Sequence, residues 1–167
     1  VVLVVAAFAM IAWGWIGYMP PIEDMENPKD KFASEIYSSD MEVIGRFYQS
    51  KSNRVYVHYD EISPYLVNAL IATEDIRFKD HSGIDVKALF RAFIKRGLLF
   101  QKSAGGGSTI TQQLAKLLYS PNADNVVERL FQKPQEWVIA VQLERFYTKE
   151  EIVNMYLNHF DFLNNAV

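Results

Sequence analysis

The chain has 167 residues, of which half are hydrophobic, and it carries a formal net charge of −3. This length allows one domain with a sizeable core, and the slightly acidic balance gives no reason to expect a nucleic acid partner. Because the chain has no cysteine, disulfides, thiolate metal sites and a cysteine nucleophile are excluded.

Residues 1–19 contain no charged side chain and are nearly all apolar. About 20 such residues are enough to cross the hydrocarbon core of a bilayer. Pro20 and Pro21 would end a helix there, and a charged stretch over residues 23–31 follows. We therefore expect a transmembrane anchor over residues 1–19. A buried core helix is one alternative, and a signal peptide is the other, although no small-residue cleavage site follows the apolar run.

The segment after the apolar run has the composition of β-strands. Three stretches within residues 35–59 are rich in β-branched and aromatic residues, with turn residues between them, namely EIYSSD, EVIGRFYQ and RVYVHY. We expect a small β hairpin within a linker over residues 20–60, which joins the anchor to a mainly α-helical domain that begins at residue 61.

The first two helices of that domain have clear start signals. Ser63 is a candidate N-cap, and Pro64 would occupy the first helical position. Asp85 can cap a second helix that runs through Leu98. The apolar side of this second helix would carry Leu89, Phe90, Phe93 and Ile94. Together with residues 98–100, this side could either pack in the core or dip into a bilayer.

Three further helices are predicted from side chains that can cap a first turn, and these side chains belong to Thr109, Asp124 and Thr148. The first and the third have the spacing of a capping box, with Gln112 and Glu151 three residues later. Pro134 should kink the long helix that Asp124 begins.

A carboxylate lies on the apolar stripe of the helix that is predicted to begin at Pro64. Val67, Ile71, Glu74 and Phe78 follow the spacing i, i+4, i+7 and i+11, so they share one face. A carboxylate in line with a core stripe is expected to be partly desolvated, which makes it a better base. The alternative is that Glu74 is an ordinary surface residue at a helix end.

The residues after Glu74 have several open interpretations. Asp75 could bind a metal, position a loop or simply be solvated. His81 is more often structural than catalytic in such a turn. Gly83 is expected to supply a backbone conformation that other residues cannot adopt.

A glycine loop leads into the third helix. Residues 105–107 are all glycine, which lets the backbone approach a ligand closely, and the helix that follows presents free N–H groups and a partial positive charge. The polar face of this helix carries Thr109, Gln112, Gln113 and Lys116, and the opposite side carries Ile110, Leu114 and Leu117. The pattern suits a diphosphate, although it is not a P-loop because the lysine does not follow the glycines directly. A flexible linker before a capped helix is the alternative.

The long fourth helix has one charged face. Arg129, Lys133 and Glu136 lie at i, i+4 and i+7. Another face carries Val127, Leu130, Val138 and Val141. The charged face could serve an anionic substrate, or it could be a solvated, salt-bridged surface, and Glu144 and Arg145 have the same ambiguity.

Taken together, these segments resemble glycosyltransferase family 51, the peptidoglycan glycosyltransferases of class A penicillin-binding proteins (penicillin-binding protein 1A type) and of monofunctional transglycosylases. Four stretches are similar to the motifs of that family: EDIRFKDHSG (74–83), GGSTITQQLAK (106–116), KPQEWVIAVQLER (133–145) and EEIVNMYLN (150–158).

The resemblance implies a lysozyme-like, mainly α fold with an N-terminal transmembrane helix and a small β hairpin linker. Residues 61–167 would form a glycosyltransferase domain that lacks its C-terminal part. The implied reaction polymerises lipid II into β-1,4 glycan strands with inversion, and it releases a lipid diphosphate.

The resemblance also implies roles for individual residues. Glu74 would be the general base, and Glu136 would assist the leaving diphosphate, either directly or through a divalent metal, Mg²⁺ or Mn²⁺. Lys116, with Arg129 or Lys133, would neutralise the diphosphate. The other expected substrate-binding residues are Asp75, Phe78, His81, Gly83, Ser108, Thr109, Gln112 and Gln113.

The chain departs from the family pattern at several positions. Leu117 stands in place of a common asparagine, Gln132 in place of an arginine, and Asn154 in place of a glutamate, while Pro134 is unusual within the third motif. Arg129, one turn before Gln132, could replace the missing arginine. None of these departures removes Glu74 or Glu136.

The implied partners are lipid II, a lipid-linked glycan chain, the membrane bilayer and other proteins of cell wall synthesis and division. The implied location is the bacterial inner membrane, with a single-pass anchor and the catalytic domain on the periplasmic side. Two other functions stay open, a lysozyme-like glycan-cleaving enzyme and a non-catalytic scaffold that binds wall precursors. A hydrolase needs a carboxylic acid and a water site, but it needs neither a glycine loop nor a cationic helix face.

Overall fold

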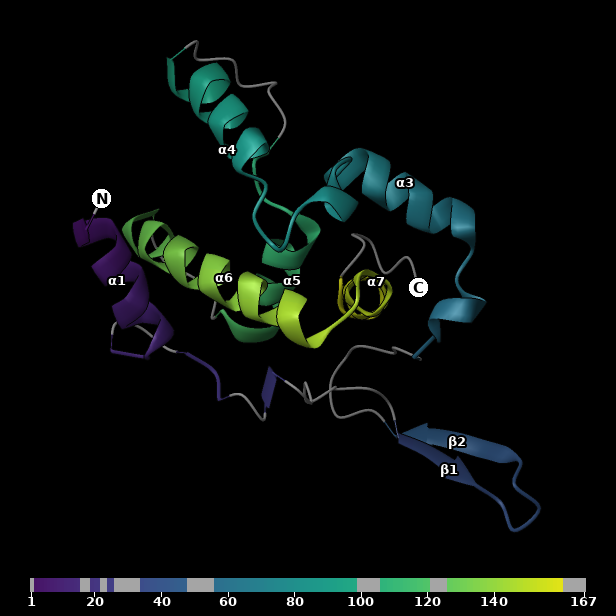
Figure 1. The fold of residues 1–167 in the computed structure, drawn as a ribbon. Helices are drawn as coiled ribbons and strands as arrows, with labels where there is room; N and C mark the ends of the chain where they lie inside the picture. The colour runs from purple at the N-terminus through teal and green to yellow at the C-terminus, as the bar shows by residue number, and fades with distance from the viewer. Residues whose placement is uncertain are drawn as a thin grey trace.

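The computed structural model of the chain is mainly helical, as the sequence predicts (Figure 1). It describes residues 2–15, 19–21, 24–25, 34–47, 56–98, 106–120 and 126–160. The α-helices are α1 (Val2–Ala12), α3 (Pro64–Glu74), α4 (Val86–Ala92), α5 (Ile110–Tyr119), α6 (Val126–Phe146) and α7 (Lys149–His159). The shorter helical turns are η1 (Tyr59–Glu61), η2 (Phe78–Asp80) and η3 (Phe93–Leu98), and the strands are β1 (Ser34–Tyr37) and β2 (Val43–Phe47).

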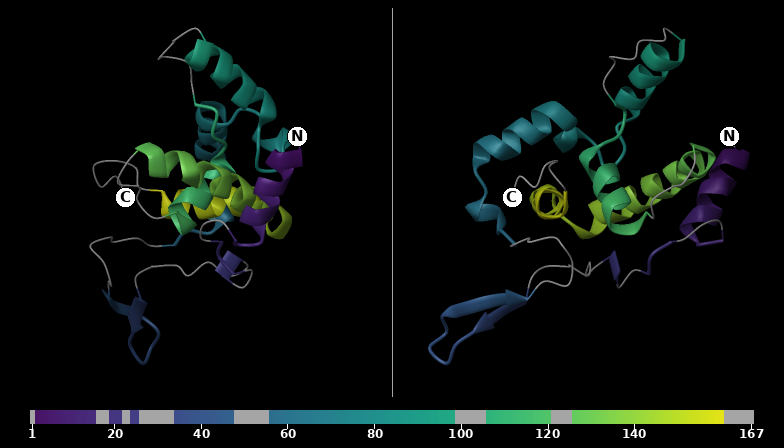
Figure 2. Two further views of the ribbon diagram at one scale, coloured as in Figure 1. Left: turned by 90° about the vertical axis from the view of Figure 1, so that its left-hand side faces the viewer. Right: turned by 180° about the vertical axis from the view of Figure 1, so that it is seen from behind.

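The core lies where α5, α6 and α7 meet, near the centre of the views in Figure 2. Each helix supplies a narrow stripe of buried side chains at helical spacing. The stripes are Ile110, Leu114 and Ala115 in α5, Ile139, Ala140 and Leu143 in α6, and Ile152, Val153 and Tyr156 in α7. Burial of each large apolar side chain contributes about 1.5–3 kcal/mol, so these three helices hold the fold together.

The predicted apolar faces of α5 and α6 are partly wrong. Leu117 is 43% exposed, whereas Ala115 is fully buried. The face of α5 that packs in the core therefore includes Ala115 and excludes Leu117. Val138 and Val141 of α6 are only half-buried, since the contacts with the core fall on Ile139, Ala140 and Leu143.

Helix α3 begins where the sequence indicates, but it ends before Phe78, which the predicted stripe placed on its face. Pro64 is its first residue, after Ser63 at the N-cap position, although the Ser63 side chain makes no capping hydrogen bond. Val67 is buried on the inner side of α3. The helix ends at Glu74, and Phe78 reaches the core from the separate turn η2.

Helix α4 projects away from the body of the molecule (Figures 1 and 2). Asp85 caps it as predicted, because its side chain accepts a hydrogen bond from the Ala88 N–H at 2.9 Å. The helix continues into the wider turn η3 as far as Leu98. Phe90 and Phe93 are both about two-thirds exposed, so the core does not cover the apolar side that the sequence predicts for this helix.

The N-terminal helix is shorter than the predicted anchor over residues 1–19. Helix α1 ends at Ala12, and Gly14 in the following turn has a φ of +72°. The Phe8 ring stacks on Trp137 of α6, with centroids 6.1 Å apart. Within the ranges given above, no helix has both the length and the apolar character needed to cross a membrane.

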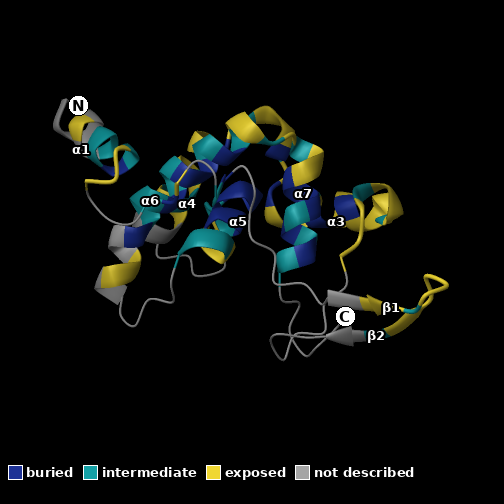
Figure 3. Cartoon of the chain, turned by 90° about the horizontal axis from the view of Figure 1, so that it is seen from below, coloured by how far each residue is buried: buried dark blue, intermediate teal, exposed yellow. Residues whose placement is uncertain are grey.

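The predicted hairpin is present. Strands β1 and β2 pair antiparallel, with Ser34 opposite Phe47 and Tyr37 opposite Val43. The hairpin stands apart from the helical body, and many of its described residues are exposed (Figures 1 and 3). Residues 56–58, from the third β-like stretch of the sequence, form no strand.

The capping predictions are confirmed to different degrees. Thr148 and Glu151 form a complete capping box at the start of α7. Thr109 accepts from the Gln112 N–H at 3.1 Å, but Gln112 forms no reciprocal bond, since its side-chain amide donates to the Gly83 carbonyl. Helix α6 continues through Pro134, and the predicted start at residue 124 lies outside the described residues.

Gly83 occupies a position that no other residue fits. Its φ is +90°, and a Cβ atom added there would lie 2.8 Å from the Ala140 carbonyl oxygen of α6. Its own carbonyl accepts from the Thr109 hydroxyl at 2.7 Å. The expected special conformation of Gly83 is therefore confirmed, and its cause is the close approach of α6.

We predict that Gly83→Ala lowers the free energy of unfolding by about 2–4 kcal/mol, because alanine disfavours positive φ and its methyl group overlaps the α6 backbone. Gly45→Ala is the matched control, because a Cβ at Gly45 of β2 meets no heavy atom within 4 Å. Urea unfolding followed by circular dichroism gives both values. Equal stability of the two variants would contradict the packing described here.

Candidate active site

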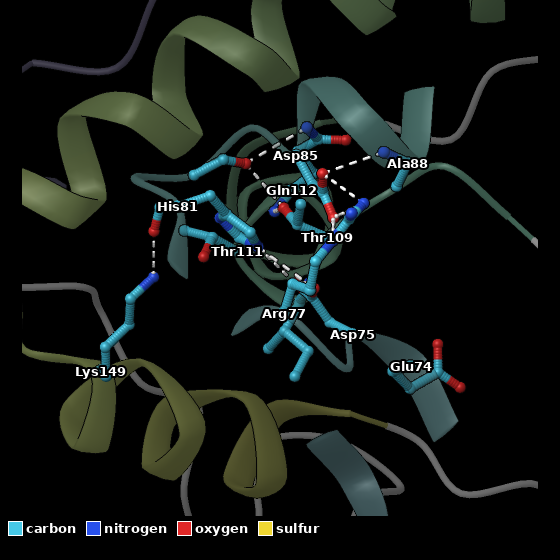
Figure 4. A network of polar contacts seen from close by, with 12 residues as sticks. Glu74, Asp75, Arg77, His81, Asp85, Ala88, Thr109, Thr111, Gln112 and Lys149 are labelled. Atoms are coloured by element: carbon cyan, nitrogen blue, oxygen red, sulfur yellow. Dashed lines mark hydrogen bonds and ion pairs between the residues drawn. The ribbon is translucent and has the colours of Figure 1, made fainter. Parts of the chain in front are cut away.

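Glu74 is the last residue of α3, and its side chain is exposed. Its Oε2 atom accepts a hydrogen bond from Nε2 of Gln113 at 2.8 Å. The expected desolvation is not observed, because the helix ends at Glu74 and Phe78 turns into the core beyond it. Glu74 points away from the polar network around its neighbours (Figure 4), so it is an accessible carboxylate with one fixed oxygen.

Asp75, the next residue, is buried and points into the molecule. Its Oδ2 atom accepts from the backbone N–H of Ile110 at 3.2 Å and lies 3.0 Å from Nε2 of His81. Ile110 is the first residue of α5. Of the three interpretations that the sequence left open for Asp75, this geometry favours the positioning of a loop (Figure 4).

The N-terminus of α5 is therefore already occupied by an anion from the protein itself. Asp75 accepts a hydrogen bond from the Ile110 N–H, and the Thr109 hydroxyl accepts one from the Gln112 N–H. These are first-turn donors that the sequence assigned to a diphosphate. A carboxylate at a helix N-terminus gains both hydrogen bonds and a favourable interaction with the helix dipole.

The predicted polar face of α5 divides into a buried part and an accessible part. Thr109 and Gln112 are almost fully buried, and both donate to the Gly83 carbonyl. Gln113 is half-buried and Lys116 is exposed. Of these four residues, only Gln113 and Lys116 are accessible to a substrate.

The glycine loop approaches a helix of the protein. A Cβ atom at Gly107 would lie 3.2 Å from Cβ of Ala92 and 3.3 Å from Cδ2 of Leu89, both in α4. The small size of Gly107 thus permits close packing against α4.

Glu136 forms a second polar group with residues of α6 and the glycine loop. It is only 2% exposed and accepts from Nζ of Lys133 at 2.6 Å. The same Nζ atom is 3.4 Å from Oγ of Ser108. Arg129, one turn before Lys133 on α6, is exposed. The structure therefore brings together Ser108, Lys133 and Glu136, three of the residues for which the resemblance implies a role.

Lys149 is a contact residue that the sequence reasoning missed. Its Nζ atom donates to the His81 carbonyl at 2.6 Å and to Oε1 of Glu144 at 2.8 Å, and it lies 4.2 Å from the centre of the Phe78 ring. Thr111 also donates to Oε1 of Glu144, at 2.6 Å. Lys149 is the first residue of α7, where the helix dipole disfavours a cation. This unfavourable position was the sequence signal that the lysine has a specific partner. Phe78 and His81 thus contact Lys149, and these contacts link the first motif to the start of α7.

One cluster has the ligand types for a metal ion. Atoms of Asp75, His81 and Asp85 lie within 4.8 Å of one another. However, Arg77 donates to both oxygens of Asp85, at 2.9 and 2.8 Å, and Asp85 also caps α4. Burial acts to raise the pKa of Asp85, but the Ala88 N–H and the Arg77 guanidinium outweigh it and hold that pKa below its usual value. Because these donors already compensate the carboxylate, the cluster does not fit a divalent cation.

A cavity of about 510 Å³ lies between η1, α3 and α7. Phe78 and Lys149 line it, but Glu74 and Glu136 do not. The candidate chemistry is therefore on the surface around the C-terminus of α3, and it is separate from this cavity.

We predict that Lys149→Met lowers the free energy of unfolding by about 2–3 kcal/mol, because it leaves the carboxylate of Glu144, whose side chain is 5% exposed, without its cation. Thermal unfolding is the measurement, with Lys87→Met on the exposed side of α4 as the matched control. A second change, Glu144→Gln, should recover part of the loss. If Lys149→Met and Lys87→Met have the same unfolding temperature, Lys149 does not compensate the charge of Glu144.

Comparison with known proteins places the chain in a family. The transglycosylase family matches residues 40–167. Penicillin-binding protein 1A of Escherichia coli (strain K12) is 36% identical over 141 residues, or 84% of this chain, and that of Pseudomonas aeruginosa is 34% identical over 152 residues, or 89%. The biosynthetic peptidoglycan transglycosylase of Nitrosomonas eutropha is 44% identical over 109 residues, or 65%.

The chain spans only part of these curated relatives. It covers 16% of the Escherichia coli protein, 17% of the Pseudomonas protein and 43% of the Nitrosomonas protein. The family match, in contrast, covers most of this chain and includes Glu74, Asp75, Gln113, Glu136 and Lys149. The chain belongs to the transglycosylase family.

Proposed function

We propose that this chain is the glycosyltransferase part of a bacterial cell wall enzyme that polymerises lipid II into β-1,4 glycan strands. The observation that carries the proposal is the exposed carboxylate of Glu74, held by Gln113 next to the buried Asp75. The relative from Nitrosomonas eutropha bears the name of a biosynthetic peptidoglycan transglycosylase, which supports the same reaction class.

In the proposed reaction, Glu74 acts as the general base. It takes the proton of the 4-hydroxyl on the acceptor sugar as that oxygen bonds to the anomeric carbon of the donor. The bond from the anomeric carbon to the lipid diphosphate breaks, and the configuration inverts. A base must reach the proton that it removes, and the exposed position of Glu74 meets this requirement.

The leaving diphosphate is stabilised by cations on α5 and α6. Lys116 and Arg129 are exposed, and Lys133 is partly exposed. Positive charges fixed near the leaving group stabilise the negative charge that develops on it. Because Glu136 is buried and bonded to Lys133, we assign it the task of holding Lys133 in place. No step is assigned to a divalent cation.

The remaining parts of the proposal concern the membrane. We propose residues 1–19 as a single-pass anchor, residues 20–60 as the linker and residues 61–167 as a lysozyme-like catalytic domain on the periplasmic side of the inner membrane. The exposed Phe90 on the projecting helix α4 and the exposed Phe93 at the start of η3 support contact with the bilayer. Lipid II and the lipid-linked glycan are the proposed substrates, and other cell wall synthesis and division proteins are proposed partners.

We predict that Glu74→Gln lowers the rate of lipid II polymerisation by about 100-fold or more, since a general base contributes a factor of that size. The measurement compares the full-length protein and this variant in detergent with labelled lipid II, and it records both lipid II binding and glycan length. The variant should bind lipid II and make almost no glycan. Glu42→Gln, at an exposed glutamate beside the hairpin turn, is the control and should polymerise normally.

Other outcomes of that experiment would contradict the proposal. If wild type and variant both bind lipid II and make no glycan, the protein is a scaffold. If wild type shortens existing glycan strands, it is a glycan-cleaving enzyme. A Glu74→Gln variant with the wild-type rate would exclude Glu74 as the base.

A further inference from the structure

The side chain of Gln113 is bonded on both sides. Its Nε2 atom donates to Oε2 of Glu74 at 2.8 Å, and its Oε1 atom accepts from the hydroxyl of Tyr156 at 3.0 Å. The three residues come from α3, α5 and α7, so one amide connects three helices that are distant in the sequence. A chain of hydrogen bonds thus runs from the core to the exposed carboxylate.

The Tyr156 end of this chain is fixed. Tyr156 is only 1% exposed, and its ring stacks on Phe160 with centroids 4.9 Å apart. Burial, followed by the negative charge of Glu74, raises the pKa of Tyr156 to about 12. The hydroxyl therefore keeps its proton at neutral pH and remains a donor.

Two partners together hold the direction of the Gln113 amide. The two ends of a glutamine side chain are similar in shape, so neighbouring groups decide which end faces which partner. The carboxylate of Glu74 can only accept, so it takes the NH₂ group of Gln113, and the Tyr156 hydroxyl donates to the amide oxygen that is left facing the core. A reversed amide would place its oxygen against the carboxylate, which is repulsive.

We propose that Tyr156 is a positioning residue which, through Gln113, fixes the orientation of the Glu74 carboxylate. The inference rests on the proposed function, in which Glu74 is the base. Tyr156 is buried and does not touch the substrate, so its effect reaches the reaction only through Gln113. A hydrogen bond donated by a fixed amide holds one oxygen of Glu74 in place and leaves the other oxygen free to meet the substrate hydroxyl.

The test is a double-mutant cycle on the polymerisation rate of the full-length protein, expressed per molecule that binds lipid II. Tyr156→Phe should lower kcat by about 3- to 10-fold, the factor that one neutral hydrogen bond is worth, and it should leave KM unchanged. Gln113→Leu should lower kcat by at least as much. Adding Tyr156→Phe to Gln113→Leu should lower kcat no further, because the path from Tyr156 to Glu74 is already broken.

Tyr147→Phe is the matched control. Tyr147 donates its hydroxyl to the backbone carbonyl of Met25 at 2.6 Å, so this variant loses a hydroxyl hydrogen bond that does not involve Gln113. It should lower the unfolding temperature and leave kcat unchanged. The proposal is overturned if Tyr156→Phe behaves as this control does, or if its effect on kcat adds in full to that of Gln113→Leu.

A second measurement does not depend on activity. In protein labelled with ¹⁵N at glutamine, the side-chain NH₂ signals of Gln113 should shift in Tyr156→Phe and stay in place in Tyr147→Phe. If the wild type makes no glycan, the proposed function fails, and these signals still show whether Tyr156 orients Gln113. If the signals do not move in Tyr156→Phe, the positioning role fails even in a protein that polymerises lipid II.

Discussion

The hydrogen bond from the Ile110 N–H to the buried carboxylate of Asp75 joins two segments that are 35 residues apart, and the site depends on it. Glu74 precedes Asp75 by one residue, and Gln113 follows Ile110 by about one helical turn. Fixing Asp75 at the start of α5 therefore also brings Glu74 to Gln113. A hydrogen bond to a charged group contributes about 1.5–3 kcal/mol, and the helix dipole adds about 0.3–2 kcal/mol in a buried setting.

Two further sets of contacts connect the first motif to the neighbouring helices. The Gly83 carbonyl accepts from Thr109 and Gln112, which ties the end of the first motif to the start of α5. Lys149 ties the carbonyl of His81 to Glu144 at the end of α6. Many of the motif residues are thus buried and act as supports, while the exposed positions around them are left for chemistry. This division explains why only a few residues of each motif can meet a substrate.

The sequence predicted the features that depend on local chemistry. Asp85, Thr109 and Thr148 start their helices as their capping chemistry indicates, and the hairpin lies in the β-like stretch. The resemblance placed Glu74 and Gln113 in motifs but could not say that they are bonded to each other. That contact depends on the distant pair of Asp75 and Ile110, which no spacing along the chain reveals.

The predictions that were wrong concern which neighbour covers a given face. Periodicity placed Leu117 on the apolar side of α5, but Leu117 is exposed. For the apolar side with Phe90 and Phe93, where core packing and bilayer contact were both left open, the structure shows exposed side chains. At the first turn of α5, for which the sequence suggests an anionic ligand, the Ile110 N–H donates to Asp75 of the protein itself. Helical spacing describes one helix at a time, and packing partners are decided by the whole fold.

The most direct test of this account is a crystal structure of Asp75→Ala compared with the wild type, with the distance from Oε2 of Glu74 to Nε2 of Gln113 as the measured quantity. The account predicts that this distance, 2.8 Å in the wild type, increases beyond hydrogen-bonding range, about 3.5 Å, as the end of α3 separates from α5. A distance that stays at 2.8 Å without the Asp75 carboxylate would show that the hydrogen bond between Asp75 and the Ile110 N–H does not position Glu74.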